Sequence, residues 1–382
     1  IVTESSQFLS IENSVIEGSI FQFLGADVDI VTIRKLSHSE LKNISLSLLN
    51  NFKSHSLLEE FQCINSNVES QINLLTKLKR YVLKIENNAT IRIKSNDLVE
   101  RENSKQLIFA YGGAGKTHVL WSLGMYLYEE TNITPVYISL RDFSSINEIE
   151  NYLNLLKKGL SFEVLNQSEN IIFLLDGLTE FSRNKQHKSE LKKLFSLLNS
   201  SKTISTSRSM NIISGCENWN LELIDKEQVT RFIIESGYDI EKIDEPLFEL
   251  LSYPLLLILY VILGGKSTST SELFTEYFNQ LSLDIDDKSM LHKILSLSAM
   301  DMDISHEDMK WAVFENKFHQ YCEKKNKDNY KPLLEKLGLF NRRGVMLEPL
   351  HDLYWEWLVG CGLIFSWVEI KDEVIENLRV RN

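Results

Sequence analysis

The residues best suited to chemistry lie in a glycine-rich turn between an apolar run and a segment with helical spacing. The turn is residues 110–117, AYGGAGKT, and the apolar run before it is residues 107–109. Backbone N–H groups at a helix start surround phosphate oxygens, and the helix dipole favours their negative charge. Lys116 would reach the β- and γ-phosphates of a nucleoside triphosphate, and the Thr117 hydroxyl would ligate Mg²⁺. The order of strand, turn and helix therefore predicts a phosphate loop that binds a nucleotide.

This turn departs from the phosphate-loop pattern G-x-x-x-x-G-K-[ST] at one position, where the chain has Ala110 instead of glycine. A glycine-rich turn that merely precedes Lys-Thr is the alternative interpretation, and the flanking strand and helix patterns favour the phosphate loop. The residues expected to contact the nucleotide are Gly112, Gly113, Ala114, Gly115, Lys116, Thr117 and His118.

A candidate metal ligand follows the apolar run at residues 171–175. Asp176 comes directly after this run, at the expected carboxyl end of a buried strand. An acid in that position, downstream of a phosphate loop, is the expected Mg²⁺ ligand. Many strands end in aspartate, so the prediction depends on the pairing with the loop. We therefore predict Thr117 and Asp176 as Mg²⁺ ligands, and Lys116 and Asp176 as catalytic residues.

The overall composition is that of an ordinary globular protein, with 382 residues, 43% hydrophobic and 25% charged. The net charge of -12 argues against a general nucleic-acid-binding or anionic-membrane surface. The longest apolar run, residues 254–263, is shorter than the about 20 residues that span a bilayer. Four widely separated cysteines indicate a reducing, cytoplasmic location. The chain begins with Ile1, so we expect it to be processed or truncated.

Strand and helix patterns alternate over residues 101–226. Apolar runs at residues 135–140, 171–175 and 202–206 are separated by helical segments, and residues 221–224 are a candidate further strand. This alternation predicts an α/β fold, with a parallel sheet between helices. Ligands bind such sheets at the carboxyl ends of the strands.

The flanking regions have different patterns. We expect a helical domain over residues 227–285, including a long helix at 246–263, and a winged-helix domain over residues 286–382. The wing is expected as a hairpin at residues 339–347. Residues 1–100 are an α/β N-terminal region, an effector remnant or linker.

Within the N-terminal region, residues 20–23 and 28–33 are candidate strands, and residues 68–83 have helical spacing. We interpret the basic residues around Arg80 as a solvated helix face.

Several motifs together resemble STAND-class NTPases of the NACHT type, the family of NLR immune receptors and bacterial antiviral sensors. The family's G-x-x-G-x-G-K-T loop corresponds to residues 110–117, and its D-G-h-D-E strand end corresponds to residues 176–180, DGLTE. Its T-S-R strand end matches residues 206–208, and its x-x-P-L helix start matches residues 252–255. The sequence EPLHD, ending at residue 352, matches a histidine motif of the family's winged helix.

This resemblance, over residues 105–365, implies roles for three further residues. Arg208 would sense the γ-phosphate, Pro254 would pack on adenine, and His351 would contact the β-phosphate of ADP in the resting state. Each also has a plainer interpretation: a loop arginine, a proline that begins a core helix, and a histidine at the edge of the core.

One departure from the family has a chemical consequence. The family's second acid, which polarises the attacking water, is replaced by Thr179. Threonine cannot accept a proton at neutral pH. Glu180, one residue further on, is the remaining candidate for a catalytic carboxylate. We therefore expect slow ATP hydrolysis, with the nucleotide acting mainly as a conformational latch.

The resemblance implies a nucleotide-switched signalling ATPase in innate immune or antiphage defence. It would hold ADP at rest and form a homo-oligomer with ATP and Mg²⁺ after sensing a protein ligand, such as a viral protein, through a region outside this chain. Two alternatives remain. An AAA+-like motor should have a glutamate directly after Asp176, where the chain has Gly177. An ADP-bound scaffold would bind nucleotide without switching.

Overall fold

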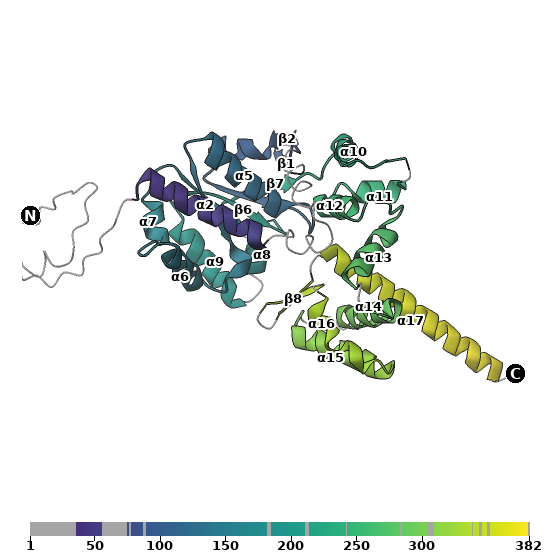
Figure 1. Cartoon of the computed structure of the whole chain (residues 1–382). Coiled ribbons are helices and arrows are strands. Elements are labelled where there is room, and N and C mark those ends of the chain that lie inside the picture. Colours follow the sequence, from purple (N-terminus) through teal and green to yellow (C-terminus); the bar gives the residue numbers. More distant parts are fainter. Residues whose placement is uncertain are drawn as a thin grey trace, which may run out of the picture. The chain divides into compact units, whose positions relative to one another are not determined.

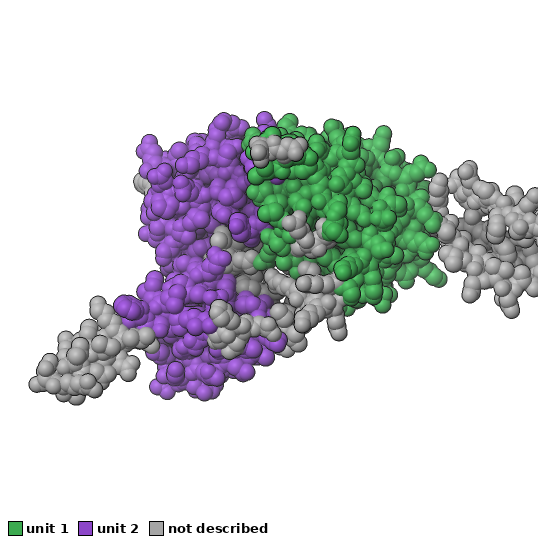
Figure 2. All heavy atoms as spheres, turned by 180° about the vertical axis from the view of Figure 1, so that it is seen from behind, with its two compact units in different colours: residues 1–52, 84–109, 117–220 green, residues 53–83, 110–116, 221–382 purple. Residues whose placement is uncertain are grey.

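A computed structural model describes residues 36–380 except 56–74, 76–77, 87–88, 182–184, 211–213, 242, 283–284, 305–308, 338, 344–345 and 350–351. The chain divides into two compact units, each assembled from separate stretches of sequence (Figure 2). Unit 1 comprises residues 1–52, 84–109 and 117–220, and unit 2 comprises residues 53–83, 110–116 and 221–382. The candidate phosphate loop therefore groups with unit 2, although the strand before it and the helix after it belong to unit 1.

A seven-stranded sheet with the order β2-β1-β7-β3-β6-β5-β4 forms the centre of unit 1. The strands are β1 Tyr81–Glu86, β2 Ala89–Lys94, β3 Lys105–Phe109, β4 Thr134–Ser139, β5 Ile171–Asp176, β6 Lys202–Ser207 and β7 Glu217–Leu221. β3 pairs in parallel with β6 and β7, and β5 pairs in parallel with β4 and β6. The parallel arrangement predicted from the apolar runs is confirmed for these strands, which are largely buried.

Helices surround the strands of this sheet (Figure 1). They are α2 His38–His55, α5 Lys116–Glu130, α6 Ile146–Leu156, α7 Phe162–Asn166, α8 Leu178–Phe181 and α9 Lys185–Leu197, with the short 3₁₀ helices η1 Ser95–Glu100 and η2 Leu140–Asp142. Gly124 allows α5 to approach its neighbours closely, since a Cβ there would lie 2.7 Å from Leu49 Cδ2 and 3.1 Å from Leu174 Cδ1. The apolar faces of these helices and strands form the core of unit 1.

The strand register brings the carboxyl ends of the parallel strands to one edge of the sheet. Phe109 at the end of β3 pairs with Ser207 at the end of β6. Ser139 at the end of β4 pairs with Asp176 at the end of β5. The segments that follow these strands therefore begin at the same edge, where ligands of parallel sheets bind.

Unit 2 is mainly helical. Its elements are α10 Lys226–Glu235, α11 Glu245–Leu250, α12 Pro254–Ile262, α13 Thr270–Leu281, α14 Lys288–Ile304, α15 Trp311–Lys324, η3 Asp328–Tyr330, α16 Leu333–Lys336, the antiparallel hairpin of β8 Phe340–Arg343 and β9 Met346–Pro349, and α17 Asp352–Val380. The hairpin lies at the predicted place. Its assignment to a winged-helix domain stays a prediction.

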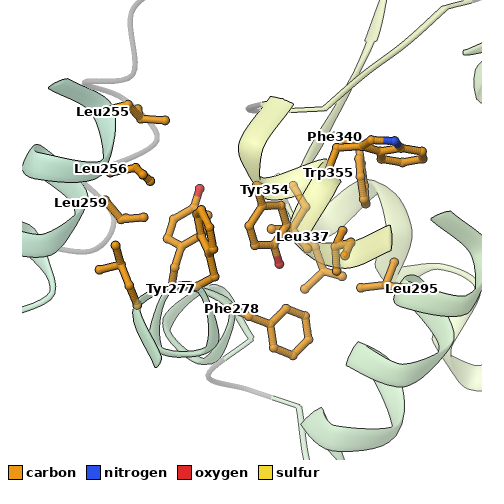
Figure 3. Packing of buried hydrophobic residues seen from close by; sticks show 14 of the residues in the cluster. Leu255, Leu256, Leu259, Tyr277, Phe278, Leu295, Leu337, Phe340, Tyr354 and Trp355 are labelled. Atoms are coloured by element: carbon orange, nitrogen blue, oxygen red, sulfur yellow. The ribbon is translucent and has the colours of Figure 1, made fainter. Parts of the chain in front are cut away.

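Aromatic side chains join the helices of unit 2 into one core (Figure 3). Tyr354 of α17 contacts Tyr277 of α13 edge-on, with ring centroids 5.6 Å apart, and Phe340 of β8 contacts Trp355 in the same way at 6.2 Å. Such edge-on pairs are the preferred aromatic geometry. Tyr354 and Trp355 of the closing helix are therefore core residues.

Three sequence predictions need correction. Residues 81–83, expected to be helical, begin strand β1 instead; tyrosine, valine and isoleucine in this segment are residues that favour strands. The single helix expected over 246–263 is divided into α11 and α12, because a proline disfavours helical geometry in the residue before it. The fifth parallel strand is β7, Glu217–Leu221, which ends where the predicted strand at residues 221–224 was expected to begin. The candidate strands at 20–23 and 28–33 lie outside the described residues.

None of the helices in the described ranges combines the length and apolar character that a membrane span requires.

Candidate functional site

The turn between β3 and α5, the predicted phosphate loop, contains two glycines with left-handed backbone. Gly113 and Gly115 have φ values of 75° and 82°, in the left-handed region where a side chain is strained. Lys116 is the first residue of α5, and its Nζ donates hydrogen bonds to the carbonyl oxygens of Ala110 and Tyr111, both at 2.8 Å. The lysine thus folds back along the loop, and its ammonium group lies at the carbonyls that open the turn.

Arg80 supports this loop within unit 2. Its Nη2 donates hydrogen bonds to the carbonyl oxygens of Ala114, at 2.7 Å, and Glu222, at 2.8 Å. The residue is only 8% exposed. Burial lowers the pKa of the Arg80 guanidinium to about 10, so the group stays charged at neutral pH. Among the described residues, its Nε and Nη1 atoms have no hydrogen-bond partner. A buried positive charge with spare donors therefore lies beside the loop.

Gly115 is fixed by its surroundings as well as by its backbone. A Cβ at this position would lie 2.9 Å from Pro254 Cγ and 3.0 Å from Arg80 Nη1, closer than side chains approach. Pro254 is the buried first residue of α12, with Tyr253 at the N-cap. The structure thus brings the predicted adenine-contacting proline against the predicted phosphate loop. Its contact with adenine stays a prediction.

In unit 1, the two predicted Mg²⁺ ligands share one hydrogen-bond donor. Arg141 Nη2 donates to Thr117 Oγ1 and to Asp176 Oδ2, each at 2.9 Å. The two oxygens are therefore less than about 6 Å apart, although they come from different elements. Both are hard oxygen donors of the kind that Mg²⁺ prefers, and in such sites water and phosphate oxygens complete the shell. The donor set fits a nucleotide-bound Mg²⁺. In this structure the cation that both oxygens contact is the Arg141 guanidinium.

The Asp176 carboxylate is oriented by its other oxygen. Oδ1 accepts a hydrogen bond of 2.5 Å from the hydroxyl of Thr206, which in turn accepts from the backbone N–H of Gly177 at 2.9 Å. Asp176 is 1% exposed. Burial and the negative charge of Asp176 raise the pKa of Tyr137, on the adjacent strand, well above its usual value. The tyrosine therefore stays protonated beside the carboxylate.

Thr179 holds a neighbouring segment in place. Its Oγ1 accepts a hydrogen bond from the backbone N–H of Arg208 at 2.8 Å and bonds the Ser207 hydroxyl at 2.9 Å. Thr179, Ser207 and Arg208 thus meet at the edge of the sheet that carries Asp176. The predicted role of Arg208 towards the γ-phosphate stays a prediction.

Three predicted site residues are not placed at the site. Glu180 lies in α8, but its side chain is outside what the structure describes. His351 lies outside the described residues. His118 is in the first turns of α5, where its ring centroid is 6.0 Å from that of Trp121 and its Nε2 is 3.4 Å from the Ser122 hydroxyl. A contact of His118 with the nucleotide stays a prediction.

Sequence reasoning missed two arginines at the site. The interpretation of Arg80 as part of a solvated helix face is wrong, because Arg80 lies outside any helix and its side chain is buried. The spacing of the basic residues contains no signal for the burial of Arg80. Arg141 could have been found, because it follows the apolar run of β4, whose carboxyl end lies at the same edge as Asp176.

No protein-family model matches the chain, and no curated protein matches it in sequence. Solved structures with some similarity include Aeropyrum pernix Orc1 in complex with DNA, with 12% identity over 76% of this chain and 91% of that chain and a TM-score of 0.35. AMPPCP-bound DnaA from Aquifex aeolicus has 14% identity over 64% of this chain and 89% of that chain, with a TM-score of 0.34.

A STAND protein with a tetratricopeptide repeat sensor from Pyrococcus horikoshii has 19% identity over 69% of this chain and 41% of that chain, with a TM-score of 0.29. These low scores establish no family. The function has to be argued from the residues of the chain itself.

Proposed function

We propose that this chain binds ATP and ADP at the phosphate loop and hydrolyses ATP slowly. The observation that carries the proposal is the meeting of Thr117 and Asp176 around a single cation, the guanidinium of Arg141. A hydroxyl directly after a loop lysine and a carboxylate at the end of a buried strand are the protein ligands of a nucleotide-bound Mg²⁺.

In this proposal the loop holds the phosphates through its backbone. The left-handed glycines Gly113 and Gly115 leave backbone N–H groups open to an anion, and the start of α5 adds its dipole. Lys116 exchanges its two carbonyl partners for phosphate oxygens. Arg80 keeps the loop in shape through Ala114 and adds positive charge beside it. Pro254, against Gly115, forms one side of the adenine site.

Thr117 and Asp176 would hold the metal ion, which supplies charge neutralisation at the phosphates when bound. Thr206 and Gly177 keep the Asp176 carboxylate turned towards it. Thr179 holds the backbone of Arg208 but cannot take a proton from water at neutral pH. The proposed outcome is binding without fast turnover.

We further propose that the nucleotide acts as a switch of the STAND type. ADP would favour a resting state through Pro254 and His351. ATP with Mg²⁺ would favour a homo-oligomer after a protein ligand is sensed outside this chain, in a signalling role such as antiphage defence. This part rests on the motifs at residues 176–180, 206–208 and 252–255.

An AAA+-like motor is the alternative, and one observation argues against it. A motor of this kind uses a glutamate directly after the metal-binding aspartate, and the chain has Gly177 there, with φ at 86°. A glutamate would be strained in that conformation. The second alternative is an ADP-bound scaffold that does not switch. It would bind the same nucleotide but would not form larger assemblies with ATP.

Native mass spectrometry of the purified protein, with and without added ATP and Mg²⁺, tests these proposals. We expect bound ADP in the monomer, and larger assemblies with ATP. ADP without assembly would support the scaffold, and a protein that retains and binds no nucleotide would overturn the proposed function. Lys116→Ala should lose the nucleotide. Lys158→Ala, an exposed lysine of unit 1, is the matched control and should keep it.

A further inference from the structure

Arg141 makes contacts that a bound Mg²⁺ would also need. A single nitrogen, Nη2, donates to both Thr117 Oγ1 and Asp176 Oδ2 at 2.9 Å. These are the oxygens assigned to the metal in the proposed function, on which the present inference rests. A guanidinium and a metal ion cannot occupy the space between the same two oxygens at once.

We propose that Arg141 competes with Mg²⁺ for these two oxygens. Without nucleotide, Arg141 holds the metal ligands together. When a nucleotide brings Mg²⁺, the metal ion displaces Arg141. Arg141 thereby sets the Mg²⁺ concentration that nucleotide binding requires.

The position of Arg141 follows from the sheet. Asp176 at the end of β5 pairs with Ser139 at the end of β4, and the chain then enters η2, which contains Arg141. The arginine is therefore held one short turn away from the carboxylate by regular strand pairing. Its contact with Asp176 follows from the register of two buried strands.

Electrostatics explain why a cation is needed in this place. Asp176 is almost completely buried, and a buried carboxylate without a counter-charge is strongly unfavourable. Arg141 supplies that charge through a salt bridge. Mg²⁺ would supply it equally, so one cation can replace the other without leaving the carboxylate unpaired.

The difference in burial between Arg141 and Asp176 indicates which group moves when Mg²⁺ replaces the guanidinium. The Arg141 side chain is 43% exposed, whereas that of Asp176 is 1% exposed. Water can solvate the guanidinium when it leaves, and the carboxylate stays in place to accept the metal. Thr206 holds Oδ1 throughout, because that bond does not involve Arg141.

The test measures how fluorescent mant-ADP binding depends on buffered Mg²⁺, a readout that needs no hydrolysis. For Arg141→Gln we expect the half-saturating Mg²⁺ concentration to fall by about tenfold relative to wild type, because a charge-assisted hydrogen bond no longer has to be broken. Arg141→Lys keeps the charge but loses the planar donor group, and should lie between the two. Arg231→Gln, an exposed arginine paired with Glu227, is the control and should match wild type.

An unchanged or higher Mg²⁺ midpoint in Arg141→Gln would overturn the inference while leaving the proposed function intact, provided wild type binds mant-ADP. If wild type binds no mant-ADP at any Mg²⁺ concentration, the proposed function fails instead. Circular dichroism checks that each variant is folded. If Arg141→Gln is unfolded, Arg141→Lys decides the question, with a lowered midpoint supporting the competition and an unchanged one refuting it.

Discussion

Thr117 Oγ1 and Asp176 Oδ2 lie at the same distance, 2.9 Å, from one nitrogen of Arg141. The hydroxyl belongs to the helix that follows the phosphate loop, and the carboxylate belongs to the end of β5. β6 lies between β3 and β5 in the sheet, so the two residues meet only because all these strands end at one edge.

Asp176→Asn should reduce ATP hydrolysis by at least about tenfold, because the amide loses the charge that binds Mg²⁺. Phosphate release under saturating ATP measures the effect. Asp142→Asn, an exposed acid on η2, should retain the wild-type rate. Equal rates for the two variants would remove Asp176 from the metal site.

Arg80→Lys should weaken mant-ADP binding by about tenfold. A lysine side chain is shorter and lacks the rigid planar group that aims Nη2 at the carbonyls of Ala114 and Glu222. Fluorescence titration at fixed Mg²⁺ measures the affinity. Lys79→Ala, the exposed neighbouring residue, is the control. If both variants bind like wild type, Arg80 does not shape the loop.

Thr179→Asp should raise the rate of ATP hydrolysis several-fold. An aspartate restores a proton acceptor and can still accept the hydrogen bond from the Arg208 backbone. Thr179→Ser keeps a hydroxyl and should hydrolyse ATP at the wild-type rate. Steady-state phosphate release compares the three proteins, and a Thr179→Asp variant no faster than wild type would show that slow turnover has another cause.

Gly362→Ala should lower the free energy of unfolding by about 2 kcal/mol, because overpacking a close helix contact forces the backbone to shift. A Cβ at Gly362 of α17 would lie 2.3 Å from the carbonyl oxygen of Ser296 on α14. Gly360→Ala, two residues earlier, meets nothing within 4 Å and should be neutral or stabilising. Chemical denaturation compares the variants, and equal losses would contradict this account.

His292 should make the protein less stable as the pH falls. Its ring stacks on Trp357 at 4.6 Å, and burial lowers its pKa to about 4. The unfolded chain takes up a proton near pH 6.5 and the folded chain does not. Stability is therefore complete above pH 6.5 and declines towards pH 4, by on the order of 3 kcal/mol at most.

The His292→Phe variant should show a smaller decline in melting temperature between pH 7 and pH 4.5 than wild type. His319→Phe, on α15, serves as the control for general effects of removing a histidine. An identical decline in wild type and His292→Phe would assign the pH dependence to other groups.

The sequence predicted the central strands well because their signals are local. The apolar run at residues 171–175 can only be a buried segment, and its Asp176 lies where expected. β7, with the sequence ENWNL, was missed because its polar residues alternate with Trp219 and Leu221, and only its place beside β3 explains why the two are buried. The position of this strand is determined by its pairing with β3, a tertiary contact that cannot be read from the local sequence.

The candidate site was predicted in part for the same reason. Residue types and spacing were enough to single out Lys116, Thr117 and Asp176, since a glycine-rich turn and a strand end are local patterns. Their roles towards a nucleotide and a metal ion stay predictions. Arg80 and Arg141 act through contacts with residues distant in sequence, Glu222 and Asp176. No spacing rule connects Arg80 with Glu222, so the structure was needed to find that arginine. Arg141 could have been suspected from its place directly after the apolar run of β4, but its partners are seen only in the structure.

Residues 110–116 group with unit 2, yet peptide bonds tie them to β3 on one side and to Thr117 on the other, both in unit 1. A truncation at residue 221 would leave a C-terminal fragment without Arg80 and without the loop that Pro254 touches. Dissecting this protein into separately expressed halves is therefore the wrong route to its biochemistry. The proposed nucleotide binding has to be tested in the intact polypeptide.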